Sequence, residues 1–380
     1  MRVLFVATYS GTSGASHSLI SLIKYLRIKG VQPLVLLPNR GPLEDLLIDE
    51  GIPYKQIRLF NWVISIDKYN SKKERFKWFI KKIINFLQEI RIFFILKKEK
   101  VDLIHINAIT ASWGFYASRI NRVPIIWHIR EFLEEDLNKR FWNKNRAFKQ
   151  LNTSDCVIAI SDSVKNKYVK FINQKRLVRI YNGIDTEKYK KLESNIFERE
   201  IVILTLAGRI TKEKGHEEVL YAIDKLVNSG IDKIKVRFIG SEGDEYFINN
   251  ITKLIKELAL ENYVELSGYR PDMHNVWNET DIALVCSKSE AFGRVTVEAM
   301  MAGALVIGAN KGGTAEIISN KYGLMYEQGN YASLAEKIKY AIKNKEEMIA
   351  IAKEGQVFAY KNFTAENNAQ NIYNVYKKLL

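Results

Sequence analysis

Residues 282–301 read IALVCSKSEAFGRVTVEAMM, and this segment has the clearest pattern of secondary structure in the chain. It opens with a short apolar run that does not alternate with polar residues, which is typical of a buried parallel strand. Its second half has the apolar spacing of a short helix. The segment is therefore a strand, a loop that carries Glu290, and a helix that carries Glu298, which is one step of a Rossmann-like α/β unit.

The loop of this segment is suited to an anion. Gly293 allows a ligand to approach the backbone closely, and the helix that begins beside it presents free amide groups and a partial positive charge. Glu290 and Glu298 flank this point, and carboxylates bind hydroxyls rather than phosphates. A ribose and a hexose on either side of a diphosphate would supply such hydroxyls, which points to a sugar nucleotide.

The segment resembles the paired-glutamate signature of glycosyltransferase family 4, retaining enzymes of the GT-B fold, and further matching pieces follow in order along nearly the whole chain. The resemblance implies that Glu290 contacts the transferred hexose and Glu298 the ribose. It places the rest of the donor contacts in this segment at Phe292, Gly293, Arg294 and Val295. The alternative is that both glutamates are solvated carboxylates flanking a helix.

The chain length and cysteine content fit two domains in a reducing compartment. The 380 residues, 47% of them apolar, are enough for two cores of ordinary size. Cys156 and Cys286 lie in apolar runs, so we interpret them as buried thiols. No signal peptide and no apolar run of membrane-spanning length is visible. We expect a cytoplasmic protein, or one attached only peripherally to the inner face of the membrane.

The positive charge is confined to the first half of the chain. Residues 1–200 hold 36 Lys and Arg against 20 Asp and Glu, whereas residues 201–380 hold 22 against 23. A basic domain suits an anionic lipid, an acidic glycan or a nucleic acid, and charge alone does not choose among them. Because no nucleic-acid-binding motif is present, nucleic acid is the least supported partner.

Two series of apolar strands alternate with amphipathic helices. The predicted strands are 3–8, 33–37, 103–107, 124–128, 156–160 and 178–181 in the first series, and 201–207, 235–239, 264–266, 282–286 and 305–308 in the second. This pattern predicts two Rossmann-like domains with parallel sheets, and the resemblance implies that they face each other across a cleft. We expect an acceptor domain over 1–186, with a crossover helix over 363–380, and a donor domain over 187–362, joined through a charged linker.

A glycine and two cations follow the first strand of the second series. Gly208 opens space for a ligand, Arg209 can contact two phosphate oxygens, and Lys214 adds a point charge. Family 4 enzymes have a matching arginine and lysine for the donor diphosphate, so the resemblance gives that role to both. The alternative is two solvated surface cations. Lys212 lies in the same loop at an unmatched position and is left out of the site.

The loops after the next strands are candidates for the nucleobase. One begins at Gly240, and another contains Tyr269 and Arg270, which are able to cover a base. In similar enzymes these loops hold the base, although ordinary turns would explain the glycines equally well. The 311–316 segment is a further glycine loop before a helix and supports the phosphate pocket in this interpretation.

The first domain contributes two candidates. The loop 10–16 resembles the family's glycine loop next to donor and acceptor, with Gly14 retained but the adjacent glycine replaced by Ser13. His128 ends a strand at the position of the family's interdomain histidine, near the transferred sugar. A lone histidine at a strand end is otherwise a structural residue. His105 remains open between packing and function.

Together these residues predict a retaining hexosyltransferase that needs no metal or other cofactor. Arg209 and Lys214 would stabilise the leaving nucleoside diphosphate, and the acceptor would be a glycan or a lipid-linked sugar in surface polysaccharide synthesis. Transferases of the other main fold hold a metal with two aspartates one residue apart, and no aspartates here have that spacing. The alternatives are a sugar-nucleotide epimerase of the same fold and a catalytically silent binding subunit.

The stretch 72–100 is a candidate for contact with an anionic membrane. Between Arg75 and Glu89 its apolar residues form one helical stripe, and lysines flank it on both sides. The competing interpretation is an ordinary crossover helix whose stripe packs on the sheet. Either interpretation is compatible with the sequence.

Overall fold

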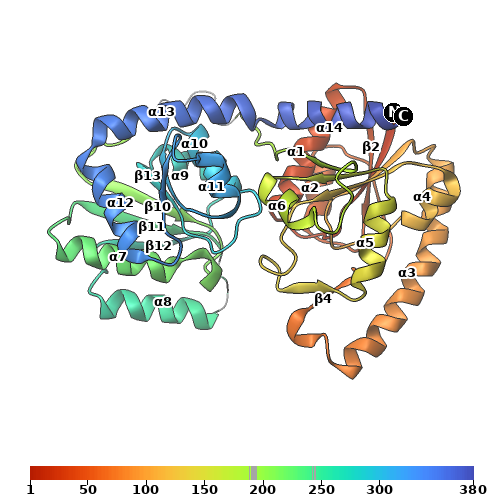
Figure 1. Ribbon diagram of the computed structural model, residues 1–380, viewed down its shortest axis with the longest axis horizontal. Helices are drawn as coiled ribbons and strands as arrows, with labels where there is room; N and C mark the ends of the chain where they lie inside the picture. The colour runs from red at the N-terminus through yellow and green to blue at the C-terminus, as the bar shows by residue number, and fades with distance from the viewer. Residues whose placement is uncertain (188, 190–194, 242, 244) are drawn as a thin grey trace. The chain divides into compact units, whose positions relative to one another are not determined.

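The chain forms two compact units, which are described separately (Figure 1). The computed structural model describes residues 1–187, 189, 195–241, 243 and 245–380. The first unit comprises Met1–Gly183 and Ala365–Leu380, and the second comprises Ile184–Thr364. The predicted linker residues Lys188, Lys190, Lys191 and Glu193, and Glu242 in the Gly240 loop, lie outside the described residues.

The first unit is built on a parallel sheet with strand order β3-β2-β1-β5-β6-β8-β9. The strands are β1 (Arg2–Val6), β2 (Gln32–Leu37), β3 (Tyr54–Gln56), β5 (Leu103–Ile106), β6 (Ile125–Ile129), β8 (Cys156–Ala159) and β9 (Leu177–Arg179). The helices are α1 (Gly14–Ile28), α2 (Pro42–Asp49), α3 (Lys72–Lys98), α4 (Phe115–Asn121), α5 (Lys144–Thr153), α6 (Asp162–Tyr168) and α14 (Ala365–Leu379), with a 3₁₀ turn at Ile66–Lys68. Because helices cover the sheet, its central strands β5 and β6 are buried along their whole length, and they are apolar apart from His105 and His128.

The second unit repeats this plan, with strand order β12-β11-β10-β13-β14-β15, all parallel. Its strands are β10 (Val202–Ala207), β11 (Ile234–Ile239), β12 (Val264–Gly268), β13 (Ile282–Val285), β14 (Leu305–Ala309) and β15 (Leu324–Tyr326). Its helices are α7 (His216–Asn228), α8 (Glu245–Glu257), α9 (Met273–Asn278), α10 (Arg294–Met301), α11 (Gly312–Ile318), α12 (Tyr331–Lys343) and α13 (Lys345–Asn362), with a 3₁₀ turn at Lys212–Lys214. The α/β fold with two parallel sheets is confirmed.

The chain returns to the first unit at its last helix. α13 belongs to the second unit, and α14 packs against α1 in the first, as Figure 1 shows. Ile372 and Tyr376 of α14 are fully buried in the same core as Leu19 and Leu22 of α1. The first unit therefore buries its core with segments from both ends of the chain.

A small antiparallel pair lies outside the first sheet. β4 (Val63–Ser65) pairs with β7 (Lys139–Phe141), and the backbone amide of Trp142 donates to the carbonyl of Trp62 just beyond the pair. Both strands are short and partly exposed, and no periodicity in the sequence indicates them. The pair holds the segment before α3 against the segment before α5.

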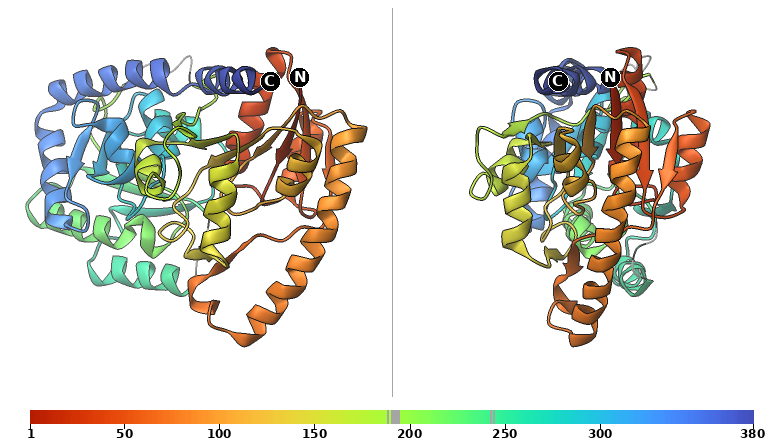
Figure 2. Two further views of the ribbon diagram at one scale, coloured as in Figure 1. Left: turned by 45° about the vertical axis from the view of Figure 1, so that its right-hand side comes forward. Right: turned by 90° about the vertical axis from the view of Figure 1, so that its right-hand side faces the viewer.

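The expectation that the apolar stripe of α3 packs on the sheet is wrong. Figure 2 shows α3 at the edge of the first unit, with its N-terminal half reaching beyond the sheet. The exposed apolar residues of α3 are Phe76, Phe79, Ile80, Ile83, Phe86, Leu87, Ile90 and Phe94; of these, Phe79, Ile83 and Phe86 also border a pocket on the inner side of the helix. The opposite side of the helix faces the unit and buries Ile92 and Leu96.

Polar contacts fix α3 in this orientation. The Asn85 side-chain oxygen accepts a hydrogen bond from the Phe60 amide at 2.9 Å, and its nitrogen donates one to the Phe60 carbonyl at 2.6 Å. The Glu89 carboxylate accepts the amides of Gly114 and Ala117, at the start of α4, at 2.8 and 2.9 Å. Because three backbone amides depend on these two side chains, rotation of the helix would leave those amides unsatisfied. None of the helices within the described residues combines the length and the apolar character needed to cross a membrane.

Candidate active site

The predicted donor residues of the second unit gather where its strand order reverses. β10 and β13 are neighbours in the sheet but are not consecutive in the chain, so the crossovers leave in opposite directions from this point. In doubly wound sheets, ligands bind at the carboxyl ends of the strands at such a switch. The loop after β10 supplies Gly208, Arg209 and Lys214, and the loop after β13 supplies Glu290.

An ion pair joins the two loops. The Lys214 ammonium lies 2.6 Å from Glu290 Oε1, and Ser287 donates its hydroxyl to the same oxygen at 2.9 Å. The side chains of Lys214 and Glu290 keep 30% and 15% of their surface exposed, so the pair is open to a ligand. Arg209 is exposed, and among the described residues no carboxylate forms an ion pair with it.

Two glycines allow the strands to approach each other beneath this pair. A Cβ on Gly240 would lie 1.9 Å from the Gly208 carbonyl oxygen, a distance that no side chain tolerates. Gly208 has φ +147, and the aliphatic stem of Lys214 lies over it at 3.5 Å from the position of a Cβ. Gly208 and Gly240 thus allow the close backbone packing on which the position of Lys214 depends.

A second pair lies in the first turns of α10. Arg294 Nη2 donates to Glu298 Oε1 at 2.8 Å, an (i, i+4) contact with both side chains mostly buried. Gly293 precedes the helix with φ 87, a left-handed conformation that favours glycine. Val295 is partly buried, whereas Phe292 is buried and packs edge-on against Phe363. Phe292 therefore offers its backbone rather than its ring.

The glycine loop before α11 supports this segment from behind. The Gly313 amide donates to the Glu290 carbonyl at 2.7 Å. A Cβ at Gly312 would lie 2.7 Å from that same carbonyl oxygen, and one at Gly313 would lie 2.4 Å from the Phe292 oxygen. These contacts hold the backbone at Glu290 and Phe292, and the role of the loop in a phosphate pocket stays a prediction.

The candidate base-binding residues lie further out. Arg270 forms a two-pronged ion pair with Asp272, at 2.9 and 2.8 Å, and Tyr269 is 69% exposed. Tyr269 is therefore accessible to a ligand, whereas Arg270 is engaged by its neighbour.

His128 belongs to a buried hydrogen-bonded chain in the first unit. Arg130 Nη2 lies 3.1 Å from His128 Nδ1, His105 Nε2 lies 3.2 Å from the same nitrogen, and the Tyr376 hydroxyl lies 2.5 Å from His105 Nδ1. Arginine only donates, so His128 Nδ1 accepts and its proton is on Nε2. Burial, with the Arg130 charge, lowers the pKa of both histidines, that of His105 to about 3. His128 Nε2 is a buried donor without a partner in the described part of the chain.

The loop at Gly14 is arranged by local hydrogen bonds. Ser13 caps α1 by accepting the Ser16 amide, and the Ser16 hydroxyl donates to the Gly11 carbonyl at 2.7 Å. Gly14 itself is exposed at the first position of the helix. Asn107, after β5, donates to the Ala15 carbonyl at 3.3 Å and connects this loop to Arg130.

Sequence reasoning missed several residues of these clusters. Ser287 orients Glu290, and buried Tyr189 lies near Glu298 and Arg294, so that burial and then the Glu298 charge raise its pKa. In the first unit, Arg130 and Tyr376 were missed. Arg130 directly follows the candidate strand and was the one with a visible signal, because a charged residue in an apolar context requires partners. Over the described residues, no group of three or more His, Cys, Asp or Glu side chains could hold a metal.

Comparison with known proteins identifies relatives over both units. Residues 12–188 match the family described as Glycosyltransferase Family 4, and residues 187–358 match Glycosyl transferases group 1. The N-acetyl-alpha-D-glucosaminyl L-malate synthase of Bacillus anthracis is 27% identical over 60% of this chain and 61% of its own length. The capsular polysaccharide biosynthesis glycosyltransferase CapM of Staphylococcus aureus is 25% identical over 58% and 62%. The chain thus spans about three fifths of these two relatives.

The fold also matches solved structures over its full length. The crystal structure of Anabaena Alr3699/HepE in complex with UDP and glucose has a TM-score of 0.80, with 23% identity and complete coverage of both chains. At this level of identity the likeness establishes the fold, which is GT-B.

Proposed function

The chain belongs to glycosyltransferase family 4, and from that premise we propose that it transfers a hexose, with retention of configuration, from a nucleoside-diphosphate sugar to a glycan or lipid-linked acceptor in surface polysaccharide synthesis. The observation that carries the proposal is the meeting of Lys214 and Glu290 at the switch point of the second sheet. The Lys214 ammonium, which suits a phosphate, is then in direct contact with the Glu290 carboxylate, which suits hydroxyls. A sugar diphosphate needs both at that spacing.

The donor would lie across the loops that follow β10 and β13. Lys214, Arg209 and the amides at the start of α10 would bind its diphosphate. Glu298 would contact its ribose, and Glu290 would contact its hexose. Lys214 would exchange its carboxylate partner in part for phosphate oxygens. The neighbouring Ser287 would keep Glu290 oriented during that exchange.

The chemistry would proceed on one face of the sugar. The bond between the anomeric carbon and the diphosphate oxygen breaks as the acceptor oxygen forms its bond to the same carbon. The departing diphosphate takes the proton of the acceptor hydroxyl. Arg209, Lys214 and the α10 amides stabilise the negative charge that develops on the leaving group, so these residues do the work that a metal does in other transferases. We propose that no metal or cofactor is needed.

His128 would donate its Nε2 proton to an oxygen of the bound sugar. The proposal rests on the tautomer that Arg130 imposes and on the unpartnered state of that nitrogen among the described residues. A neutral imidazole is the form that burial favours.

Peripheral attachment to an anionic membrane is supported by α3. Its outward apolar face and its flanking lysines Lys72, Lys73, Lys97 and Lys98 have the composition of helices that lie in a lipid interface. Phe76 and Phe86 are 68% and 66% exposed, which is costly in water without a partner surface. An anionic bilayer complements both the apolar face and the lysines.

The test is incubation with UDP-, GDP- and ADP-sugars. Release of free nucleoside diphosphate with transfer to an acceptor, and an unchanged anomeric configuration by NMR, is expected. Recovery of an isomerised nucleotide sugar would support the epimerase instead. Absence of turnover with measurable nucleotide-sugar binding would support the silent subunit. Glycosyltransferase family models match both units, which favours neither alternative.

A further inference from the structure

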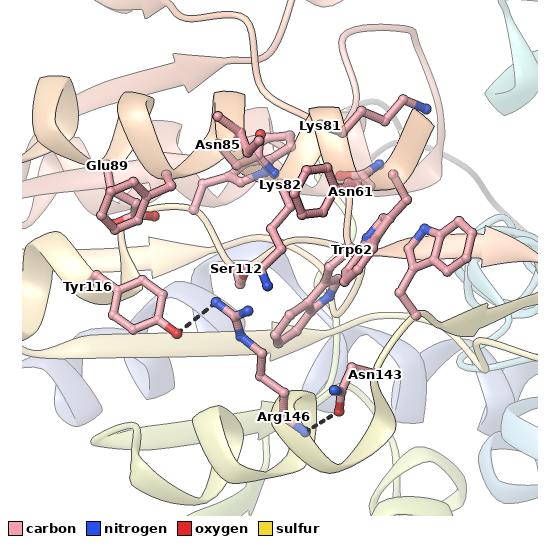
Figure 3. Close-up of a pocket in the computed structure, with 16 residues that line it drawn as sticks. Asn61, Trp62, Lys81, Lys82, Asn85, Glu89, Ser112, Tyr116, Asn143 and Arg146 are labelled. Atoms are coloured by element: carbon pink, nitrogen blue, oxygen red, sulfur yellow. Dashed lines mark hydrogen bonds between the residues drawn. The ribbon is translucent and has the colours of Figure 1, made fainter. Parts of the chain in front are cut away.

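A pocket of about 280 Å³ lies in the first unit, on the inner side of α3 (Figure 3). None of the predicted donor residues lines it. Its walls come from α3, from the segment before β4, from the loop between β5 and α4, and from the start of α5. Small-molecule sites are typically concave, largely apolar and furnished with a few polar groups, at volumes from about 300 Å³ upward. The pocket is therefore sized for one ring-sized group.

Tryptophan rings give the pocket a rigid frame. Trp62 stacks on Trp127 with ring centroids 6.0 Å apart, and its indole nitrogen donates to the Ile109 carbonyl at 2.7 Å. Trp78 of α3 and Trp142 before α5 meet at 5.2 Å. The β4–β7 pairing brings Trp62 and Trp142 to this position from segments far apart in sequence. Flat aromatic faces suit the C–H surface of a sugar ring, which is apolar between its hydroxyls.

Three cations line the pocket: Lys81 lies over the Phe60 ring, and two others reach in from opposite walls. Lys82 comes from α3 and Arg146 from α5, as Figure 3 shows. Within the described residues neither forms an ion pair with a carboxylate. Arg146 donates instead to the Tyr116 hydroxyl at 2.8 Å, and Lys82 lies 5.7 Å from the Trp78 ring centroid. Like charges that converge on one space repel unless an anion joins them.

The polar lining offsets this charge only in part, through the Glu89 carboxylate, which interacts with the Arg146 charge, and it offers hydrogen bonds. The Glu89 carboxylate is already engaged by the amides that begin α4. Asn61 donates to the Thr8 carbonyl at 3.3 Å, but its buried Oδ1 has no partner within the described residues. A buried acceptor of this kind calls for a donor, such as a hydroxyl of a ligand.

We propose that this pocket binds a saccharide unit that carries an anionic group, a phosphate or a carboxylate, as part of the acceptor. The inference rests on the proposed glycosyl transfer and names the acceptor's chemical class. The indole faces would pack against the sugar ring, and Asn61 Oδ1 would accept a hydrogen bond from a sugar hydroxyl. Lys82 and Arg146 would bind the anionic group. Such a unit could come from a free glycan or from the head of a lipid, and the apolar face on the other side of α3 favours the lipid.

The first experiment measures binding of glucose 1-phosphate by calorimetry and by quenching of tryptophan fluorescence. The host is the Arg209→Ala, Lys214→Ala double variant, which removes both cations of the proposed donor site, a competing site for phosphate. We expect binding, with methyl glucoside at least about tenfold weaker because it lacks the anion. Lys82→Gln and Arg146→Gln should each weaken binding of glucose 1-phosphate about tenfold. Lys73→Gln, on the same helix but outside the pocket, should leave it unchanged.

A second arm identifies the source of the anion. Vesicles of phosphatidylinositol in phosphatidylcholine present a phosphate next to a ring, whereas phosphatidylglycerol presents the charge without a ring. Preference for phosphatidylinositol that is lost in Lys82→Gln and Arg146→Gln would indicate a lipid head. Equal binding to both vesicles, with glucose 1-phosphate still bound, would indicate a free glycan.

Absence of glucose 1-phosphate binding by a folded protein, equal affinity for methyl glucoside, or full affinity in the Lys82→Gln, Arg146→Gln double variant would overturn the proposal. Release of nucleoside diphosphate from the donor by the parent protein, with water taking the sugar in place of the acceptor, tests the proposed function separately. A protein that releases it but does not bind the sugar phosphate would lack the pocket function alone. The reverse result would contradict the transferase assignment and not the pocket.

Discussion

The ammonium of Lys214 lies 2.6 Å from Glu290 Oε1, across the switch point of the second sheet. If this lysine holds the donor diphosphate, Lys214→Ala should lower turnover about a hundredfold or more, the usual loss for one contact that strengthens in the transition state. Lys212→Ala, in the same loop, is the matched control and should be nearly silent. Steady-state release of nucleoside diphosphate measures both. Near-normal turnover in a folded Lys214→Ala protein would contradict the assignment.

Substitutions of Glu290 and Glu298 should affect different quantities, the rate of transfer and the affinity for the nucleoside diphosphate respectively. Glu298→Gln should weaken binding of the bare nucleoside diphosphate, because a ribose contact exists before and during transfer. Glu290→Gln should lower the rate of transfer and leave that affinity intact, since it frees Lys214 from its carboxylate partner. Isothermal titration with the nucleoside diphosphate distinguishes the roles. Equal losses of affinity in the two variants would count against the division.

Membrane binding should depend on both chemical features of α3. Replacing Lys72, Lys73, Lys77 and Lys81 with glutamine should weaken cosedimentation with anionic vesicles, since each lysine near such a surface contributes about 1 kcal/mol. Phe76→Ser with Phe86→Ser should do so at high salt as well, because apolar insertion is not screened. The control replaces four exposed lysines of the second unit, Lys225, Lys233, Lys253 and Lys256. Unchanged binding in both α3 variants would exclude this helix as the attachment site.

The free energy of unfolding of the first unit should decrease as pH rises, because of Glu89. Burial raises the pKa of Glu89 from 4.5 to about 7, against the opposing effect of its hydrogen bonds from the Ala117 and Gly114 amides. Between these values the folded state binds more protons than the unfolded state, so the free energy of unfolding decreases as pH rises through that window. Glu89→Gln cannot ionise, so its stability relative to the parent should improve by at most about 3 kcal/mol between pH 4.5 and pH 8.

Thermal unfolding at pH 4.5 and pH 8 tests this expectation. Because the amide nitrogen of Gln cannot accept a hydrogen bond from an α4 amide, Glu89→Gln should be less stable than the parent at pH 4.5, and this deficit should shrink or reverse at pH 8. Glu261→Gln, at an exposed position, should follow the parent protein at both values. A difference from the parent of equal size at the two pH values would show that the amide acts through packing rather than through charge.

The sequence predicted the sheets well because their strands are continuous apolar runs. Each predicted strand lies within two residues of an observed one. The strands β3, β4, β7 and β15 were missed because they are three residues long and, apart from Tyr326, Ile64 and Phe141, not fully buried. Length and burial are the signals on which periodicity depends.

Of the site, the sequence indicated which residue types lie at the strand ends but not how they pair. The contact of Lys214 with Glu290 joins two loops that are 76 residues apart. Periodicity likewise identified the stripe of α3 but not its direction, because the direction depends on what Asn85 and Glu89 meet in distant segments. The aromatic pocket is assembled from four such segments and has no local signature.

The division of the chain also has a consequence for synthesis on the ribosome. The second unit is one continuous stretch, whereas the first needs α14, which is translated after the whole second unit. Until then, the α1 face and the buried nitrogen of His105 that meets Tyr376 lack their cover. The second unit is thus able to complete its fold before the first, even though translation starts with the first. While the chain is being synthesised, the basic first unit has an unfinished core and the exposed face of α3. A chaperone or a lipid surface would be most useful to the protein at this stage.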